Sequence, residues 1–501
     1  MSATLWLLGD QLAPQHLACV PGTVRKDLRI LMIESDARAR RLDYHPKKLV
    51  LLFSAMRHRA EALQEDGFEV DYRKSDDMLG ALRAHCEAYH PERLLTVNAS
   101  SYRGGQFQQG LTAQLGIPVE ILPNHQFLCN RYDPLPEAKL GETIRQETFY
   151  RAMRQHFNLL MDDGGKPLGG KWNFDKQNRK PLPADIDPPE PIIFEPEDVA
   201  GAVIDEVAEA YPGVGELEEF DLPVTHADAQ RAADDFFLNR LAKFGTYEDA
   251  MSQAHAVLYH SKLSPCINLG LLDPQELAQR AETAYHEGRV TINNAEGFIR
   301  QVIGWREYMF WQYHRLMPEL AAGNTFDAQQ ALPGFFWTGQ TGMNCLKHVL
   351  ARVLNDGYAH HIERLMVLSN FCTLAGIEPR AVLDWFQSAF IDASDWVMVP
   401  NVIGMGLFAD GGQIGTKPYI ASANYIHKMS DYCKICRYDH NQRTREDACP
   451  FNFLYWGFLL EHEDRLRENP RMARMLYNLK YLDDAERKRV REAVAGFLER
   501  M

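Results

Sequence analysis

The feature that most constrains the fold is the regular alternation of short apolar runs and amphipathic stretches over residues 1–125. The apolar runs are TLWLLG, LRILMIES, FEVDY, RLLTVNA and IPVEIL, and the longest stretch between them, KKLVLLFSAMRHRAEALQEDG, has helical periodicity. Short apolar strands separated by amphipathic helices are typical of a doubly wound parallel sheet. We therefore expect an α/β domain with such a sheet over residues 1–130.

Two acidic residues follow predicted strands, Asp10 after LWLLG and Glu34 after LRILMI. Parallel sheets bind ligands at the carboxyl ends of their strands, so both acids are candidate ligand contacts. No GxGxxG motif follows either strand, which argues against a dinucleotide fingerprint. The alternative is that both acids only cap turns.

The composition changes at about Pro181, where the chain becomes rich in proline and acids up to Leu222. Such a segment is typical of a connector that runs over the surface, here with one short helix inside it. From there to the C-terminus helical periodicity dominates, including one unbroken run, CLKHVLARVLNDGYAHHIERLMVLSNFCTLAG. We expect a connector over residues 131–222 and an all-α domain over residues 223–501.

The formal net charge of −14 excludes a chain that coats nucleic acid over its whole surface, because phosphate binding needs clustered Lys and Arg. A local basic face is compatible with this charge, and one segment is a candidate for it: Arg151, Arg154, Lys166, Lys171, Lys176, Arg179 and Lys180. The alternative is a solvated loop with scattered charge.

The opening MSATLWLLGDQL contains only a short apolar run, Leu5–Leu8, and lacks a basic flank and a cleavage site, so we expect no signal peptide. No apolar segment approaches the ~18 residues of a membrane span. We therefore expect a soluble, cytoplasmic protein without a membrane partner.

The strongest local signal is DYCKICRYDHNQRTREDACPFN, which places Cys433 and Cys436 in a C-x2-C pair followed by Cys449. A soft-metal site usually needs four thiolates, so a fourth must come from elsewhere in the chain. Cys345, at a predicted helix start, is the best candidate, and Cys372 is the second, although its neighbours fit a small core residue. The spacing does not separate zinc from an iron–sulfur cluster, and unrelated buried cysteines are the alternative.

The segment YAHHIERLM places two adjacent histidines in an apolar run. On one continuous helix His360 and Arg364 would share a face, and His361 would point ~100° away. The alternative is one core histidine bonded to a carbonyl and one surface histidine. Aromatic and polar residues that suit a flat heteroaromatic ligand accompany the pair on predicted helices and helix ends: Gln301, Trp305, Arg306, Trp337, Asp392, Asp395, Trp396 and Asn401.

The segment YHSKLSPCINLGLL predicts a helix start with Ser264 as N-cap and Pro265 in the first turn. Free N–H groups at such a position favour a phosphate. An ordinary cap is the alternative.

These motifs together are similar to those of the photolyase/cryptochrome superfamily, and closely to its bacterial iron–sulfur branch, the prokaryotic (6-4) photolyases and related cryptochromes. The resemblance covers almost the whole chain and rests on these segments: GDQL, FSAMRH, GGKWNFD, HSKLS, EGFIRQVIGWREYM, AHHIERLM, PNVIGM, GTKPY, NYIHKMSDYC and CRYD through ACPFN. It implies a Rossmann-like antenna domain, a connector with a DNA-facing loop, and a helical domain that holds FAD in a folded conformation.

The resemblance also implies the ligands. A 6,7-dimethyl-8-ribityllumazine antenna would lie at Asp10 and Glu34, and a [4Fe-4S] cluster on Cys345, Cys433, Cys436 and Cys449. The FAD would be bound by Ser261, Ser264, Arg306, His361, Arg364, Asp392 and Asn401. Within this set the two serines would contact the phosphates, Asn401 would face flavin N5 and Asp392 the pyrimidine edge.

The function implied by the resemblance is light-driven repair of the (6-4) pyrimidine–pyrimidone photoproduct. Reduced FAD would donate an electron to the lesion, flipped out of UV-damaged DNA, and His360, or His361 beside it, would act as general acid. Trp385 and Trp337 would pass electrons inwards, with Phe386 where related proteins can carry a tyrosine.

For contacts with the lesion or the DNA we expect Gln301, Asp175 and Lys171, with Asp175 as a candidate ligand of Mg²⁺. We expect a monomer. Two alternatives remain: a blue-light cryptochrome that signals through a partner without repair, and a zinc-bound structural protein without a cofactor.

Overall fold

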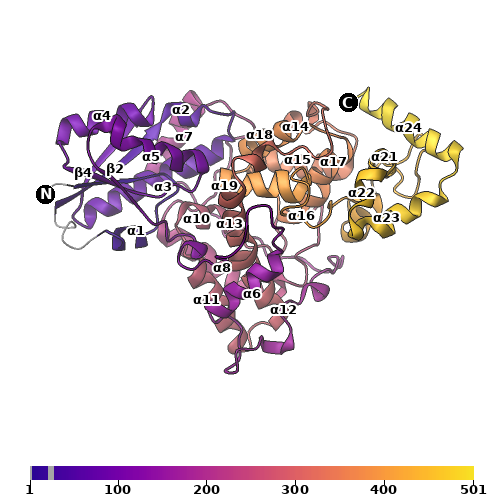
Figure 1. Ribbon diagram of the computed structural model, residues 1–501, viewed down its shortest axis with the longest axis horizontal. Coiled ribbons are helices and arrows are strands. Elements are labelled where there is room, and N and C mark those ends of the chain that lie inside the picture. The colour runs from indigo at the N-terminus through magenta and orange to yellow at the C-terminus, as the bar shows by residue number, and fades with distance from the viewer. Residues whose placement is uncertain (1–2, 21–26) are drawn as a thin grey trace.

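The N-terminal part of the protein is a parallel sheet, as seen in a computed structural model that describes residues 3–20 and 27–501 (Figure 1). The strand order is β3-β2-β1-β4-β5, and every pair is parallel. The strands are β1 Ala3–Leu7, β2 Leu28–Ser35, β3 Glu69–Ser75, β4 Arg93–Val97 and β5 Val119–Leu122. The predicted doubly wound parallel sheet is confirmed.

Alternating side chains of β1 and β2 pack on opposite faces of the sheet, because successive residues of a strand point to opposite sides. Leu5 and Ile30 belong to the core that includes α3, whereas Trp6 and Leu31 pack with α4 and α5. Helices therefore cover both faces. The helices of this part are α1 Gln15–Ala18, α2 Asp36–Ala39, α3 Pro46–Glu65, α4 Met78–Tyr89 and α5 Tyr102–Leu115.

Residues 131–222 contain two α-helices that pack in different places. The helix α6, Gln146–His156, lies against α13 and against the turn that precedes α13. The helix α7, Asp198–Ala210, returns to the sheet part and packs on α3 (Figure 1). The connector therefore contacts both parts of the molecule, and α7 is longer than the short helix expected there.

The rest of the chain is helical, as predicted, and contains no helix long and apolar enough to cross a membrane among the described residues. Its α-helices are α8 His226–Asn239, α9 Leu241–Phe244, α10 Ser264–Leu269, α11 Pro274–His286, α12 Ile292–Ile299, α13 Glu307–Leu316, α14 Phe335–Thr338, α15 Asn344–Asp356, α16 His361–Glu363, α17 Asn370–Leu374, α18 Pro379–Ala389, α19 Asp395–Val399, α20 Ala423–Met429, α21 Pro450–Glu461, α22 Glu463–Arg467, α23 Ala473–Tyr477 and α24 Asp484–Leu498.

The run that was predicted as one long helix is broken before the histidine pair. The helix α15 ends at Asp356, and Gly357 follows in the left-handed conformation with φ +60°. The chain then has no regular secondary structure up to His360, which precedes α16 in an extended conformation with φ −73° and ψ 164°. Glycine at this position is a common helix stop. The expectation that His360 and Arg364 share one helix face is therefore wrong, because His360 lies outside the helix.

A side chain at Gly357 is predicted to be destabilising for two reasons, the positive φ of this residue and the lack of space around it. A Cβ atom there would lie 2.5 Å from Ile391 Cγ2, in addition to the strain of a positive φ. We expect Gly357→Ala to lower the free energy of unfolding by more than ~1 kcal/mol, measured by denaturant titration. Gly288→Ala is the control, since Gly288 also has a positive φ, +72°, but open space around it. Equal losses in the two variants would contradict the argument from space.

Candidate functional site

The candidate site is a cavity of about 1170 Å³ between helices of the C-terminal part. Three π-helical segments contribute to its wall: Arg300–Arg306, Arg364–Ser369 and Pro400–Gly406. Such segments are rare and are frequently found at functional sites. Part of the cavity wall therefore has a π-helical backbone.

Most of the predicted FAD and lesion residues lie on this cavity, but not all. The cavity is lined by Ser261, Ser264, Gln301, Arg306, His361, Arg364, Asp392, Asn401 and Asp175, together with Trp305 and Trp396. The predicted residues that do not line it are His360, Lys171, Trp337, Trp385, Asp395, Asp10 and Glu34. Asp395 instead bonds Arg41 of the sheet part at 3.2 Å.

Asp392 is the best-connected carboxylate of the cavity. Arg364 donates two hydrogen bonds to it, of 2.9 and 3.0 Å, and the Ser264 hydroxyl donates a third of 2.7 Å. Burial raises the pKa of Asp392, but the charge of Arg364 and these hydrogen bonds outweigh it and hold the pKa below its usual value. Asp392 is therefore ionised and fixed at neutral pH.

The prediction that Ser264 caps a helix is wrong in detail. The helix α10 begins at Ser264 itself, after Leu263, and no side chain caps it. The hydroxyl is used for Asp392 instead, which explains why it does not turn back to the backbone. At six residues α10 is also too short to favour a phosphate strongly through its dipole.

Arg306 offers unused donors at the cavity. Its Nη1 pairs with Glu307, whereas Nε and Nη2 are buried without a hydrogen-bond partner in the described chain. The guanidinium lies over the rings of Phe127 and Trp396, at 4.5 and 5.2 Å from their centroids. Burial lowers its pKa, and an anionic group in the cavity would satisfy both the charge and the free donors.

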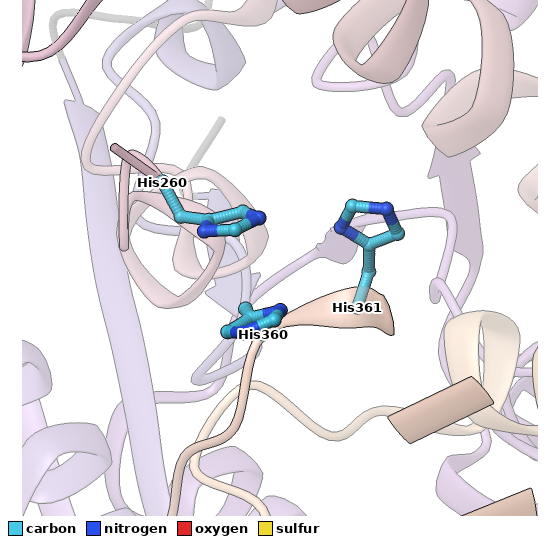
Figure 2. A group of neighbouring side chains, drawn as sticks. All are labelled: His260, His360 and His361. Carbon is cyan, nitrogen blue, oxygen red and sulfur yellow. The ribbon is translucent and has the colours of Figure 1, made fainter. Parts of the chain in front are cut away.

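Three histidines meet at one side of the cavity (Figure 2). The rings of His260 and His360 are stacked, with centroids 4.2 Å apart and planes 11° apart, and His361 stands edge-on to His260 at 5.6 Å. His360 is 1% exposed and its two ring nitrogens have no partner in the described chain. The His361 side chain is 44% exposed and lines the cavity. The second histidine of the pair, and not the first, is therefore available to a ligand.

The three histidines have donor atoms within 4.8 Å of one another, which suits a metal by distance alone. The orientation of the rings argues against it. Nδ1 and Nε2 of His260 point at the carbonyl oxygens of Val257 and Glu248, at 2.8 and 3.0 Å, and therefore not at an ion shared with the other two rings. The lone pairs of two stacked rings also lie in parallel planes and cannot converge on one ion. The group is a stack of rings in which His260 is held by backbone carbonyls.

Burial sets the proton affinity of this group. It lowers the pKa of His260 to about 4 and that of His360 well below its usual value, with further lowering by the neighbouring histidines and arginines. His360 is therefore neutral, whereas the exposed His361 has Asp249 3.8 Å from its Nε2.

The cavity is basic although the protein is acidic. Its lining cations are Arg179, Lys262, Arg300, Arg306, Arg364, Lys417, Lys428 and Arg471, and its acids are Asp175, Glu248, Asp249 and Asp392. Only part of the predicted basic segment contributes. Arg179 lines the cavity, whereas Arg154 is fully buried and donates to the carbonyl oxygens of Leu159, Trp172 and Leu160. The local basic face thus comes mainly from residues outside that segment.

The four cysteines of the predicted metal site influence one another electrostatically, and none of them lines the cavity. All nine cysteines are free thiols. Burial raises the pKa of Cys345, and the charges of Cys449, Cys433 and Cys436 raise it further, which places all four within electrostatic reach. Only burial raises the pKa of Cys372, so this cysteine does not join them. One hydrogen bond joins the two segments that carry these cysteines: the Asn344 side chain, next to Cys345, donates to the carbonyl oxygen of Tyr432, which precedes Cys433.

The two candidate antenna residues differ in their surroundings. The Ser100 hydroxyl donates to Asp10, and burial raises the pKa of this carboxyl. Glu34 accepts two hydrogen bonds from Arg57, at 2.8 and 3.0 Å, and one from Tyr72. Asp10 therefore keeps acceptor capacity for a ligand, whereas Glu34 is largely used by the protein.

The predicted electron-transfer residues form a short path from the surface. Trp337 is 43% exposed and neighbours Phe336 in α14. Trp385 is fully buried, donates from Nε1 to the Phe336 carbonyl at 3.1 Å, and stacks edge-to-face on that ring at 4.9 Å. Its neighbour Phe386 lines the cavity.

Sequence reasoning missed several cavity residues. His260 stands inside the YHSKLS motif, where only the serines were singled out, and Tyr425 and Lys428 stand inside NYIHKM. Glu248 and Asp249 belong to no motif, so no sequence signal pointed to them.

The Asp392 carboxylate is buried and Arg364 is its cation, so the loss of this pair is predicted to be costly. Arg364→Met leaves a buried carboxylate without its cation, and we expect the free energy of unfolding to fall by about 3–5 kcal/mol. The contribution of the pair is complete at neutral pH and is lost as the pH falls through the lowered pKa of Asp392. Arg380→Met, which breaks an exposed pair with Asp384, should cost under ~1 kcal/mol. Denaturant titration at pH 7 measures both.

Comparison with known proteins agrees with this geometry. The family described as deoxyribodipyrimidine photo-lyase-related protein matches residues 5–222. A (6-4) photolyase of Agrobacterium fabrum is 41% identical over 508 aligned residues that cover 100% of both chains. A cryptochrome DASH of Synechocystis is 27% identical over 158 residues, 30% of this chain and 32% of that one.

Two solved structures have a similar fold. A bacterial class III photolyase from Agrobacterium tumefaciens superposes with a TM-score of 0.56 at 15% identity, covering 100% of this chain and 98% of the other. A Synechocystis cryptochrome superposes with a TM-score of 0.55 at 15% identity, covering 85% and 88%. With its parallel sheet, its helical cavity and its full-length relative, the chain belongs to the photolyase/cryptochrome superfamily and, within it, to the (6-4) photolyases.

Proposed function

We propose that this protein is an FAD-dependent (6-4) photolyase, which uses light to repair (6-4) pyrimidine–pyrimidone photoproducts in UV-damaged DNA. The observation that carries the proposal is the joint placement of His361, Arg364 and Arg306 on one large basic cavity. The full-length similarity to a (6-4) photolyase favours repair over signalling, since the cryptochrome DASH relative aligns with less than a third of the chain.

The residues of the cavity fit FAD. The volume of about 1170 Å³ exceeds the ~300–1,000 Å³ of ordinary ligand pockets, which leaves room for a dinucleotide and part of a flipped-out base. The free donors of Arg306 suit a phosphate, and the ionised Asp392 suits the N–H groups of a flavin edge. When bound, reduced FAD supplies the electron that light transfers to the lesion.

We assign the general acid to His361. It lines the cavity and lies beside Asp249, whereas His360 is buried, neutral and stacked on His260. A general acid must reach the atom that it protonates, and only the exposed ring meets this condition. His361 would donate an N–H proton to the lesion as the hydroxyl returns to its original base, and would recover the proton when the bases are restored.

For the four cysteines we propose a [4Fe-4S] cluster. A single tetrahedral zinc with bonds of ~2.3 Å needs sulfur atoms ~3.8 Å apart. The nitrogen atoms of the three histidines all lie within 4.8 Å of one another, whereas the sulfur atoms of the four cysteines, which all belong to the described residues, do not. A wider set of four thiols suits a cluster of several irons.

Fewer contacts support the assignments of the antenna and of the electron-transfer residues. We propose Asp10 as the contact for a 6,7-dimethyl-8-ribityllumazine antenna, with Glu34 as a structural neighbour that holds Arg57. Trp337 and Trp385 are proposed to carry electrons inwards, with Phe386 between Trp385 and the cavity. We also propose that the protein acts as a monomer in the cytoplasm.

Asp175 is better suited to hold arginines than Mg²⁺. Its Oδ1 pairs with Arg300 at 3.3 Å and its Oδ2 with Arg179, so both oxygens already have a cation. We propose that Asp175 orients Arg179, and that Arg179 and Gln301 contact the DNA at the cavity. Lys171 is exposed beside this segment and would contribute charge only.

Repair is predicted to depend on His361 more than on His360. A (6-4) lesion in an oligonucleotide is irradiated with blue light and reduced protein, and recovery of intact thymines is measured by chromatography. We expect His361→Gln to lower the repair rate by ~100-fold or more, as for other general acids. His360→Gln should lose less, and both should retain flavin and photoreduction. No repair by the unaltered protein would leave the photoreceptor alternative standing, and equal losses in the two variants would refute the assignment.

Cluster ligation is predicted to be coupled to folding. Cys433→Ser should give poorly folded protein with little iron and sulfide, because metal binding contributes to folding. Cys86→Ser, at another half-buried cysteine in α4, should match the unaltered protein in iron content and melting temperature. Zinc in place of iron in the purified protein would contradict the cluster assignment.

A further inference from the structure

The turn that carries Asp10 is bonded to the loop after β4 by two side chains. The Gln11 amide donates to the carbonyl oxygens of Val97 and Asn98, both at 3.1 Å, and Gln11 is fully buried. The Ser100 hydroxyl donates to Oδ2 of Asp10. One oxygen of Asp10 is therefore held by this loop, and the other, Oδ1, accepts no hydrogen bond from another residue of the described chain.

The same loop is held from the helical part by two consecutive residues of α13. Nε2 of His314 is 3.1 Å from the carbonyl oxygen of Ser100, and the backbone N–H of Tyr102 donates to the Tyr313 hydroxyl at 2.9 Å. Burial lowers the pKa of His314 to about 4, so its ring is neutral at pH 7 and has a single N–H. Because a carbonyl oxygen only accepts, this N–H is on Nε2 and donates to Ser100.

Ser100 therefore has one bond to each part of the protein, its carbonyl to α13 and its hydroxyl to Asp10. Ser100 is 6% exposed, and a buried carbonyl that loses its donor is costly, so without His314 the loop would shift. Such a shift would move the hydroxyl away from Asp10. Burial raises the pKa of Asp10 and the hydrogen bond from Ser100 opposes this rise, so the same hydroxyl favours the ionised carboxylate.

We propose that His314 is a positioning residue for the antenna: from the helical part it holds Ser100, and Ser100 in turn fixes the Asp10 carboxylate that contacts the lumazine. This inference rests on the proposed antenna contact at Asp10. The antenna site then depends on both parts of the chain, although Asp10 and Ser100 belong to the sheet part. His314 itself does not touch the antenna.

The position of His314 on α13 separates this role from flavin binding. Met309 of the same helix lines the FAD cavity, whereas His314 does not. The His314 ring packs edge-on against Phe310, with centroids 4.5 Å apart. His314→Phe keeps an aromatic ring at this place and removes the N–H donor. Variants of His314 should therefore retain FAD.

The test measures the affinity for 6,7-dimethyl-8-ribityllumazine by equilibrium dialysis, on the full-length protein with FAD bound. We expect His314→Phe to raise the dissociation constant by ~5-fold or more, because one buried hydrogen bond is lost. His314→Gln, whose amide nitrogen can take the place of Nε2, should stay within about 2-fold of the unaltered protein. A merely structural role of the ring would give the opposite order, since phenylalanine preserves the aromatic packing and glutamine does not.

A matched control is the neighbouring residue of the same helix. Tyr313→Phe also removes one hydrogen bond from α13 to this loop, but at Tyr102, which does not bond Asp10. It should leave the dissociation constant within about 2-fold of the unaltered value. Ser100→Ala should weaken binding at least as much as His314→Phe. The double variant should lose no more than Ser100→Ala alone, because His314 acts through Ser100.

The outcome for His314 is decided by folded variants. A folded His314→Phe protein that binds the lumazine as tightly as the unaltered protein overturns the role of His314. If this variant does not fold, His314→Asn and His314→Gln decide. The amide of asparagine is too short to reach the Ser100 carbonyl, so the proposal requires weaker binding in the first variant only.

The same measurements separate this inference from the proposed function. An unaltered protein that binds no lumazine, or an affinity that stays the same in Asp10→Asn, would refute the antenna contact and the role of His314 with it, while repair by the flavin would stand. Affinities that change as expected in a protein that repairs no lesion would instead refute the repair function and leave the role of His314 intact.

Discussion

The geometry of the cavity depends on one buried carboxylate. Asp392 is held by Arg364 from the π-helical segment after α16 and by Ser264 from the start of α10, and its own carbonyl accepts from Asn268. An ionised carboxylate away from water must be paired, so these segments cannot separate without exposing or orphaning it. The residues proposed to bind FAD and the lesion follow from this junction, since Arg364 and His361 lie on the same short stretch of chain.

The sheet part could be predicted from the sequence because its signal is local. Each apolar run is a strand, and successive residues of β1 and β2 alternate between the two faces of the sheet. The grouping of Cys345 with the C-x2-C pair was also predictable from the number of ligands that a soft metal requires. His361, Arg364 and Asp392 came from family motifs, and composition alone would not have singled them out.

The break before the histidine pair was not predicted, although its signal was present. Gly357 stands directly after α15, and a glycine there stops a helix more often than it continues one. Helical periodicity on both sides concealed the break, and with it the different surroundings of His360 and His361. One residue of difference in position puts the first ring in the core and the second on the cavity.

Other parts of the site have no sequence signal at all. Asp249 and Glu248 come from a loop without a motif, and the contact of His314 with the Ser100 carbonyl depends on a fold that brings α13 to the loop after β4. Apolar periodicity does not distinguish an α-helical turn from a π-helical one, so the three wide turns around the cavity were also invisible.

Because of these π-helical turns, the geometry of the site depends on the number of residues in each of the three segments. A π turn holds one residue more than an α turn, so deleting a single residue from Arg364–Ser369 would let the segment relax to the narrower coil. Everything on one side would then rotate by ~100° about the helix axis, and the guanidinium that meets Asp392 would face a neighbouring helix. Insertions and deletions in any of these three stretches would therefore disrupt the wall of the cavity.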